Sequence, residues 1–130
     1  MIAAKTTFTD TSKRVHDAVK KAKYKNFSHA AASIRRDAIK SIRKRKDKKK
    51  ASPEGTPPFT HSGQAKRGVF FDVSATDAVI GFKKSVVGLV MATHEEGLVE
   101  EGRDYPERPT MGPALERNIE RFHRDWRSSI

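Results

Sequence analysis

The 130-residue sequence predicts an α+β fold in which helices flank a small antiparallel sheet. Two observations support this prediction. Apolar residues recur at helical spacing near both ends of the chain, and β-forming residues gather between them, at 68–74 and 78–84. A chain of this length normally forms one domain around one modest core. We therefore expect a long basic N-terminal helix, a sheet of about three to four strands, a short helix and a C-terminal amphipathic helix.

Helical patterning begins close to the N-terminus. Thr11 or Ser12 can cap a first short helix through a side-chain oxygen, and residues 24–27 are expected to break or kink it. Ser28 is a candidate cap for a second helix, which we expect over residues 28–46. Its apolar stripe steps by three or four residues and comprises Phe27, Ala31, Ile34, Ala38 and Ile42.

A proline-rich loop divides the helical half from the β-forming half. Residues 51–65 contain three prolines and two glycines, which excludes helix there, and we expect a long loop at about 46–65. Loops of that length in compact domains are usually functional or disordered. We treat residues 1–27 as an N-terminal arm or short helix, and residues 28–130 as a single α+β domain.

The second half alternates short elements with turns. Residues 75–77 form the turn between the two predicted strands, and residues 86–91 fit either a third strand or the start of a short helix. Residues 92–97 are typical of a helical turn that ends at a glycine cap. The acidic segment 98–110 is expected to be irregular, and Pro113 suits the first turn of a last helix. The stripe of that helix is Leu115, Ile119, Phe122 and Trp126.

Charge is unevenly distributed along the chain. The net charge of +11 divides into +13 for residues 1–50 and −2 for residues 51–130. Seven of the eight residues at 43–50 are basic, so they repel one another and must lie in solvent or against an acidic partner. Two interpretations stay open: a solvated helix end with its loop, or contact with phosphates or an acidic protein surface. The basic residues are Arg43, Lys44, Arg45, Lys46, Lys48, Lys49 and Lys50.

Catalytic and metal-binding patterns are weak. The chain has no cysteine, which excludes disulfides, Cys-ligated metals and Cys nucleophiles. His94 with Glu95 or Glu96 could supply metal ligands beside His61 or His123, and a small metal-dependent hydrolase remains an alternative on that ground. However, no HExxH-like spacing or phosphate-binding glycine motif is present. We expect no catalytic residue, no metal, no cofactor and no membrane span.

Four short stretches follow one another in a characteristic order. They are Ile-Arg-Arg-Asp-Ala at 34–38, the Pro-rich segment 52–67, Ala-Thr-His-Glu-Glu-Gly at 92–97, and Pro-Glu-Arg-Pro-Thr-Met-Gly-Pro-Ala-Leu at 106–115. In order and spacing they resemble the tail-completion and virion-morphogenesis proteins of tailed bacteriophages, the neck components that join head to tail. The sequence departs from that family's usual residues at Gln64-Ala65, at Glu96 and at Thr110.

The resemblance implies a non-enzymatic structural protein of the virion, assembled in the host cytoplasm. Such proteins form rings, commonly hexameric, and double-stranded DNA passes through the ring. The implied partners are further copies and other neck or tail proteins, such as stopper, adaptor, terminator or tail tube. By this analogy the 46–65 loop contacts neighbouring subunits, an adjacent ring or the channel. Candidate inter-subunit contacts are Phe59, His61, Glu95, Glu96, Glu100, Glu101, Arg108 and Pro109.

The charge distribution suggests how copies could meet. Head-to-tail contacts in a ring join two different faces of one chain. The run 43–50 is a candidate contact to a partner or to the DNA channel. We therefore hypothesise that the basic helix, or this run, meets the acidic segment 95–107 of a neighbour or of another neck protein. The alternative is a basic, non-specific nucleic-acid-binding protein that uses the run 43–50 on phosphates.

Overall fold

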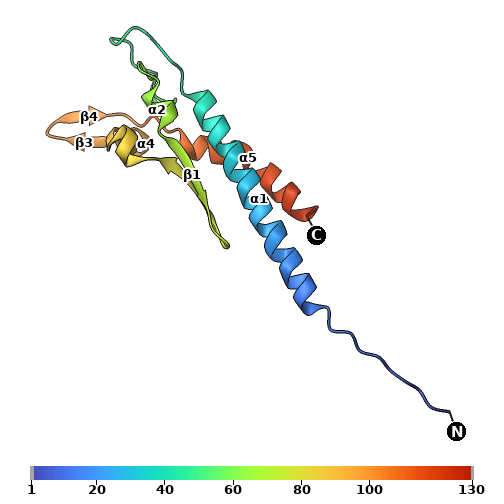
Figure 1. Cartoon of the computed structure of the whole chain (residues 1–130). Coiled ribbons are helices and arrows are strands. Elements are labelled where there is room, and N and C mark those ends of the chain that lie inside the picture. The colour runs from blue at the N-terminus through green and yellow to red at the C-terminus, as the bar shows by residue number, and fades with distance from the viewer. Residues whose placement is uncertain (1, 130) are drawn as a thin grey trace.

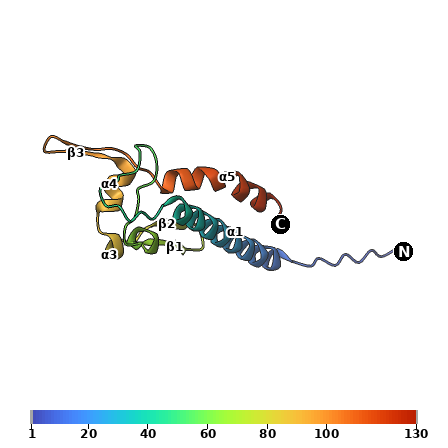
Figure 2. The same cartoon turned by 90° about the horizontal axis from the view of Figure 1, so that it is seen from above.

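The structure, a computed structural model, describes residues 2–129 and confirms the α+β class (Figure 1). A long helix runs along the molecule, and a shorter C-terminal helix lies beside it (Figure 2). In chain order the elements are α1 (Ser12–Ser41), α2 (Gln64–Arg67), β1 (Val69–Val73), β2 (Ala78–Phe82), α3 (Lys84–Val87), α4 (Val90–Glu96), β3 (Leu98–Glu100), β4 (Arg103–Tyr105) and α5 (Met111–Arg127).

Helix α1 is continuous over 30 residues, so the break expected at residues 24–27 and the second start at Ser28 are wrong. The helix contains no proline or glycine to interrupt it. Packing against α5 also stabilises the region of the expected break. The ring of Phe27 stacks on that of Phe122, with centroids 5.7 Å apart.

Helix α1 ends at Ser41, earlier than the expected end at residue 46. The next residue, Ile42, takes an extended conformation (φ −80°, ψ 109°), and its side chain is fully buried. The basic run is therefore not helical, and Lys40 instead of Lys46 is the basic residue of the last turn. At the other end, Thr11 and Ser12 provide no side-chain cap. The Ser12 backbone N–H donates to Oδ1 of Asp10 at 2.8 Å.

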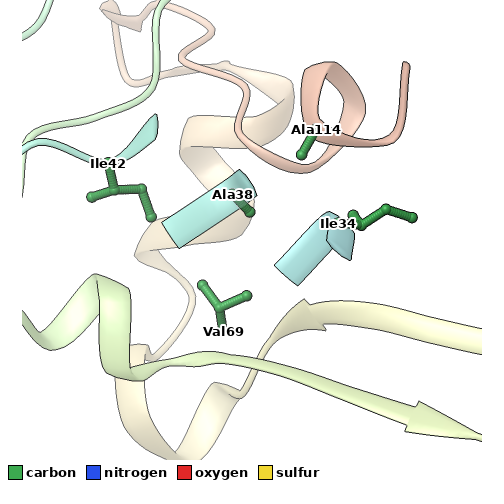
Figure 3. Close-up of a cluster of buried hydrophobic side chains, with 5 residues drawn as sticks. All are labelled: Ile34, Ala38, Ile42, Val69 and Ala114. Atoms are coloured by element: carbon green, nitrogen blue, oxygen red, sulfur yellow. The ribbon is translucent and has the colours of Figure 1, made fainter. Parts of the chain in front are cut away.

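Small residues bring the helices and the first hairpin together. The core cluster joins Ile34, Ala38 and Ile42 with Val69 of β1 and Ala114 of α5 (Figure 3). Ala38 and Ala114 are fully buried, and their short side chains allow α1 and α5 to approach closely. Figure 3 shows Val69 on one side of α1 and Ala114 on the other.

The strands form two separate hairpins within residues 2–129, which corrects the expected sheet of three to four strands. Strands β1 and β2 pair antiparallel from Val69↔Phe82 to Val73↔Ala78. Residues 86–91 fit either a strand or a helix by sequence, and in the structure they contribute to the helices α3 and α4. The second hairpin, β3–β4, occupies part of the segment that was expected to be irregular. Its turn residues Glu101 and Gly102 have φ of 50° and 74°, as a two-residue hairpin turn requires.

Helix α5 packs along α1 and includes Pro113 in its first turn, as the sequence predicts. Asp37 of α1 accepts hydrogen bonds from Nε of Arg117 at 2.7 Å and from Nδ2 of Asn118 at 3.0 Å. The stripe of α5 is only partly covered, since Leu115 and Ile119 are exposed. The helix thus keeps an apolar face that its own chain does not fill.

Candidate functional site

The basic run is held against the returning end of the proline-rich loop. Lys44 and Thr60 form an isolated parallel bridge. The Thr60 N–H donates to the Arg43 carbonyl at 2.9 Å, and the Arg45 N–H donates to the Thr60 carbonyl at 3.0 Å. These bonds place residues 58–61 beside the run, although the two segments are far apart in sequence.

Two of the predicted contact residues are fixed by this pairing. The guanidinium carbon of Arg45 lies 5.3 Å from the centroid of the Phe59 ring, in cation–π geometry. Nδ1 of His61 donates to the Arg45 carbonyl at 2.8 Å. Phe59 and His61 are therefore ordered by the basic segment of their own chain.

Arg108 connects the loop to helix α4. Its backbone N–H donates to the His94 carbonyl at 2.6 Å, and its Nε donates to the Ser52 carbonyl at 3.0 Å. One residue earlier, the Glu107 carbonyl accepts from the Gly55 N–H at 2.9 Å. The loop, α4 and the segment before α5 thus form one connected unit.

A cavity of about 190 Å³ lies where these segments meet, and we call it the basic cavity. None of the described residues that line it is acidic. A neighbouring cavity of about 390 Å³ shares Lys48, Pro58, Phe59, His61 and His94 with it. The lining of the basic cavity comprises Lys48, Lys49, Lys50, Ala51, Ser52, Pro58, Phe59, His61, His94 and Arg108.

The lining includes predicted and unforeseen residues. Lys48, Lys49, Lys50, Phe59, His61 and Arg108 were all predicted from the sequence as contact residues, whereas Arg43, Lys44, Arg45 and Lys46 lie outside the cavity. Sequence reasoning missed Ser52 and did not assign His94 to this site. Ser52 is buried in an irregular loop, where no periodicity marks buried positions.

His94 contributes little positive charge to the cavity near neutral pH. Its pKa lies below the ordinary value, because burial penalises the charged imidazolium and because the Arg108 guanidinium repels it. The positive charge of the basic cavity therefore comes from its lysines and Arg108. A carboxylate or phosphate group is the complementary ligand chemistry.

The predicted glutamate contacts separate into two kinds. Glu95 binds the N-terminus of α5 within its own chain: its carboxylate accepts from the Thr110 N–H, at 2.7 Å to Oε1, and from the Met111 N–H. An anionic group at this position also complements the helix dipole. Glu96, Glu100 and Glu101 are exposed, and Pro109 is half-buried. Among the described residues, these three exposed glutamates have no side-chain hydrogen bond or ion pair of this kind.

Within residues 2–129, no group of three or more side chains of the ligating types could hold a metal ion. In the same part of the chain, no helix combines the length and apolar character needed to cross a bilayer. Comparisons with protein-family models, curated proteins and solved structures found no match.

Proposed function

We propose that this chain is a structural protein of the bacteriophage neck, which forms a ring around the DNA channel between head and tail. The observation that carries the proposal is the convergence of the stretches that resemble neck proteins. In the proline-rich loop, Ser52 is hydrogen-bonded to Arg108 and Gly55 to Glu107. Arg108 is also hydrogen-bonded to His94. Glu95 in turn binds the start of α5. Stretches that are far apart in the sequence thus lie together in the structure.

The remaining stretch, residues 34–38, supports the same unit from α1. Asp37 pairs with Arg117 and Asn118 of α5. Nε of Arg35 donates to the Val69 carbonyl at 2.8 Å, at the start of β1. Ile34 and Ala38 of this stretch also pack in one core cluster with Ala114 of the last stretch.

The exposed surface suits a protein that docks to others. Leu89, Val90 and Val99 are large apolar residues on the half of the molecule around the basic cavity, and each is more than half exposed. Exposed apolar side chains beside charged groups are typical of interaction sites. We propose further copies, other neck and tail proteins and the passing double-stranded DNA as the partners.

Deletion of the gene from a phage that encodes the chain tests the proposal. We expect filled heads and complete tails that fail to join, and infectivity restored by the wild-type chain supplied in trans. Normal, infective particles from the deletion phage would contradict the proposal. Mass spectrometry of purified virions gives an independent check, since the chain must be a component of the particle.

A second candidate function is non-specific binding of nucleic acid. It is favoured by the exposure of all residues at 43–50, seven of which are basic. Binding to duplex DNA should then weaken steeply as salt rises, because each phosphate contact releases counterions. A chain that binds duplex DNA in this way, and that is absent from virions, would favour this function over the neck protein.

A further inference from the structure

We infer that the acidic β3–β4 hairpin of one copy docks into the basic cavity of the next copy. The inference rests on the proposed neck function and adds to it the two surfaces that meet. Glu100 and Glu101 lie at the turn of the hairpin. Lys48, Lys49 and Lys50, with Arg108, line the cavity.

The basic cavity has the chemistry and order of a carboxylate site. Its described lining carries four permanent positive charges and no negative one. Arg108 is held by the Ser52 carbonyl, so part of the cavity is ordered before a ligand arrives. Ser52 is buried, and its Oγ has no hydrogen-bond partner among the described residues. An unpartnered buried hydroxyl is unfavourable, and a carboxylate could accept its hydrogen bond.

The β3–β4 hairpin is acidic, which complements the basic cavity, and its strands are exposed to solvent. Residues 98–107 contain four acidic residues and one basic residue. Every residue of β3 and β4 is exposed, and Val99 is 77% exposed. An isolated two-stranded hairpin is marginally stable in water, so an exposed one gains from packing against another surface.

The geometry favours docking between copies over docking within one chain. The segment that follows β4 already reaches the cavity, since Arg108 lines it. From there the hairpin extends away from the body as an arm (Figures 1 and 2). Its turn therefore lies away from the body of its own chain, where another copy can reach it. Contacts of this head-to-tail kind repeat from copy to copy and close into a ring when the rotation between copies allows it.

The size of the cavity favours a side chain over a nucleic-acid duplex as its occupant. A volume of about 190 Å³ accommodates one or two carboxylate side chains. A duplex is far wider than this cavity and could touch only the exposed basic residues outside it. The acidic hairpin is the ligand that both the charge and the volume favour.

A charge-swap experiment tests the inference. The hairpin variant carries Glu100→Lys and Glu101→Lys, and the cavity variant carries Lys48→Glu, Lys49→Glu and Lys50→Glu. A matched control reverses two exposed charges on α5, with Glu116→Lys and Glu120→Lys. Circular dichroism verifies that each variant folds, and size-exclusion chromatography with light scattering measures the oligomeric state over a range of concentrations.

We expect wild type and control to form oligomers and each reversed variant alone to be monomeric. An equimolar mixture of the two variants should assemble again, because each hairpin then meets a cavity of opposite charge. Assembly of either variant alone to the wild-type extent would overturn the inference, and so would a mixture that stays monomeric. A cavity variant that assembles normally but loses affinity for duplex DNA would identify the cavity as a phosphate site instead.

The outcomes also separate this inference from the proposed function. If both charge-reversed variants assemble as wild type does, the hairpin contact is excluded, but a ring built through other contacts is not. A wild-type chain that is monomeric at every concentration overturns the docking of copies in solution. The neck function is judged independently by the phenotype of the gene deletion.

Discussion

The α1–β1–α5 core and the half of the molecule around the basic cavity are stabilised in different ways. In the core, buried apolar residues such as Ile42 and Val69 exclude water. Around the cavity, individual polar contacts by Glu95 and Arg108 fix the backbone, while large apolar residues such as Val99 stay exposed. We therefore expect the core to supply most of the stability, whereas the half around the cavity leaves large apolar side chains exposed.

The largest expected effect is in the core. Ile42→Ala should lower the free energy of unfolding by about 2–5 kcal/mol, because Ile42 is fully buried and the truncation leaves a cavity. Val99→Ala, in the exposed hairpin, should change it by less than about 0.5 kcal/mol. Urea unfolding of both variants measures the difference. Equal effects would show that the proposed division of the molecule is wrong.

Gly97 tests the packing at the base of the hairpin. Gly97 and Gly88 both have positive φ, 69° and 66°, with ψ values that only glycine adopts easily. A Cβ at Gly97 would lie 3.0 Å from Cγ of Glu107, whereas a Cβ at Gly88 would meet no atom of the described residues within 4 Å. We expect Gly97→Ala to cost about 2–3 kcal/mol and Gly88→Ala about 1–2 kcal/mol. Thermal denaturation of the pair measures the difference, and a Gly88→Ala cost as large as that of Gly97→Ala would exclude a packing contribution.

Glu95 and Glu96 provide a matched pair that tests the half of the molecule around the basic cavity. Glu95→Ala should destabilise the protein by about 1–2 kcal/mol, because the first N–H groups of α5 lose their charged acceptor. Glu96→Ala, at an exposed position, should stay within about 0.5 kcal/mol of wild type. Chemical denaturation separates the two. A neutral Glu95→Ala would mean that the cap contributes nothing to stability.

The smallest expected effect is a dependence on pH through His94. The folded-state pKa of His94 lies below its ordinary value of 6.5, so the unfolded chain binds this proton more readily. The stability contribution is complete above pH 6.5 and is lost as the pH falls toward the lowered folded-state pKa. Melting temperatures between pH 7.5 and 5 should decline less for His94→Gln than for wild type. His29→Gln, on the exposed face of α1, is the control and should follow wild type.

Much of the core region could be predicted from apolar spacing. The stripe correctly indicated Ala31, Ile34 and Ala38 as buried positions of α1, and Gly97 and Pro113 correctly marked a helix end and a helix start. The end of α1 could not be predicted, because Ile42 continues the helical spacing. What opposes the helix there is a tertiary contact, the bridge between Lys44 and Thr60.

The region around the cavity was less predictable because its contacts join distant residues. The sequence cannot distinguish Glu95 from Glu96, since the partner of Glu95 is the backbone of Thr110. The β3–β4 hairpin was missed because both of its faces are exposed, so no alternation of apolar and polar residues marks its strands. The lysines of the cavity were predictable as a charged run, but their convergence with Arg108 required the fold.

Cryo-electron microscopy of intact phage particles that encode this chain tests whether its copies form a ring at the junction of head and tail. We expect a ring of its copies at the junction of head and tail, with the hairpin of each copy reaching the basic cavity of the next. Particles whose junction is complete without this chain would contradict the account.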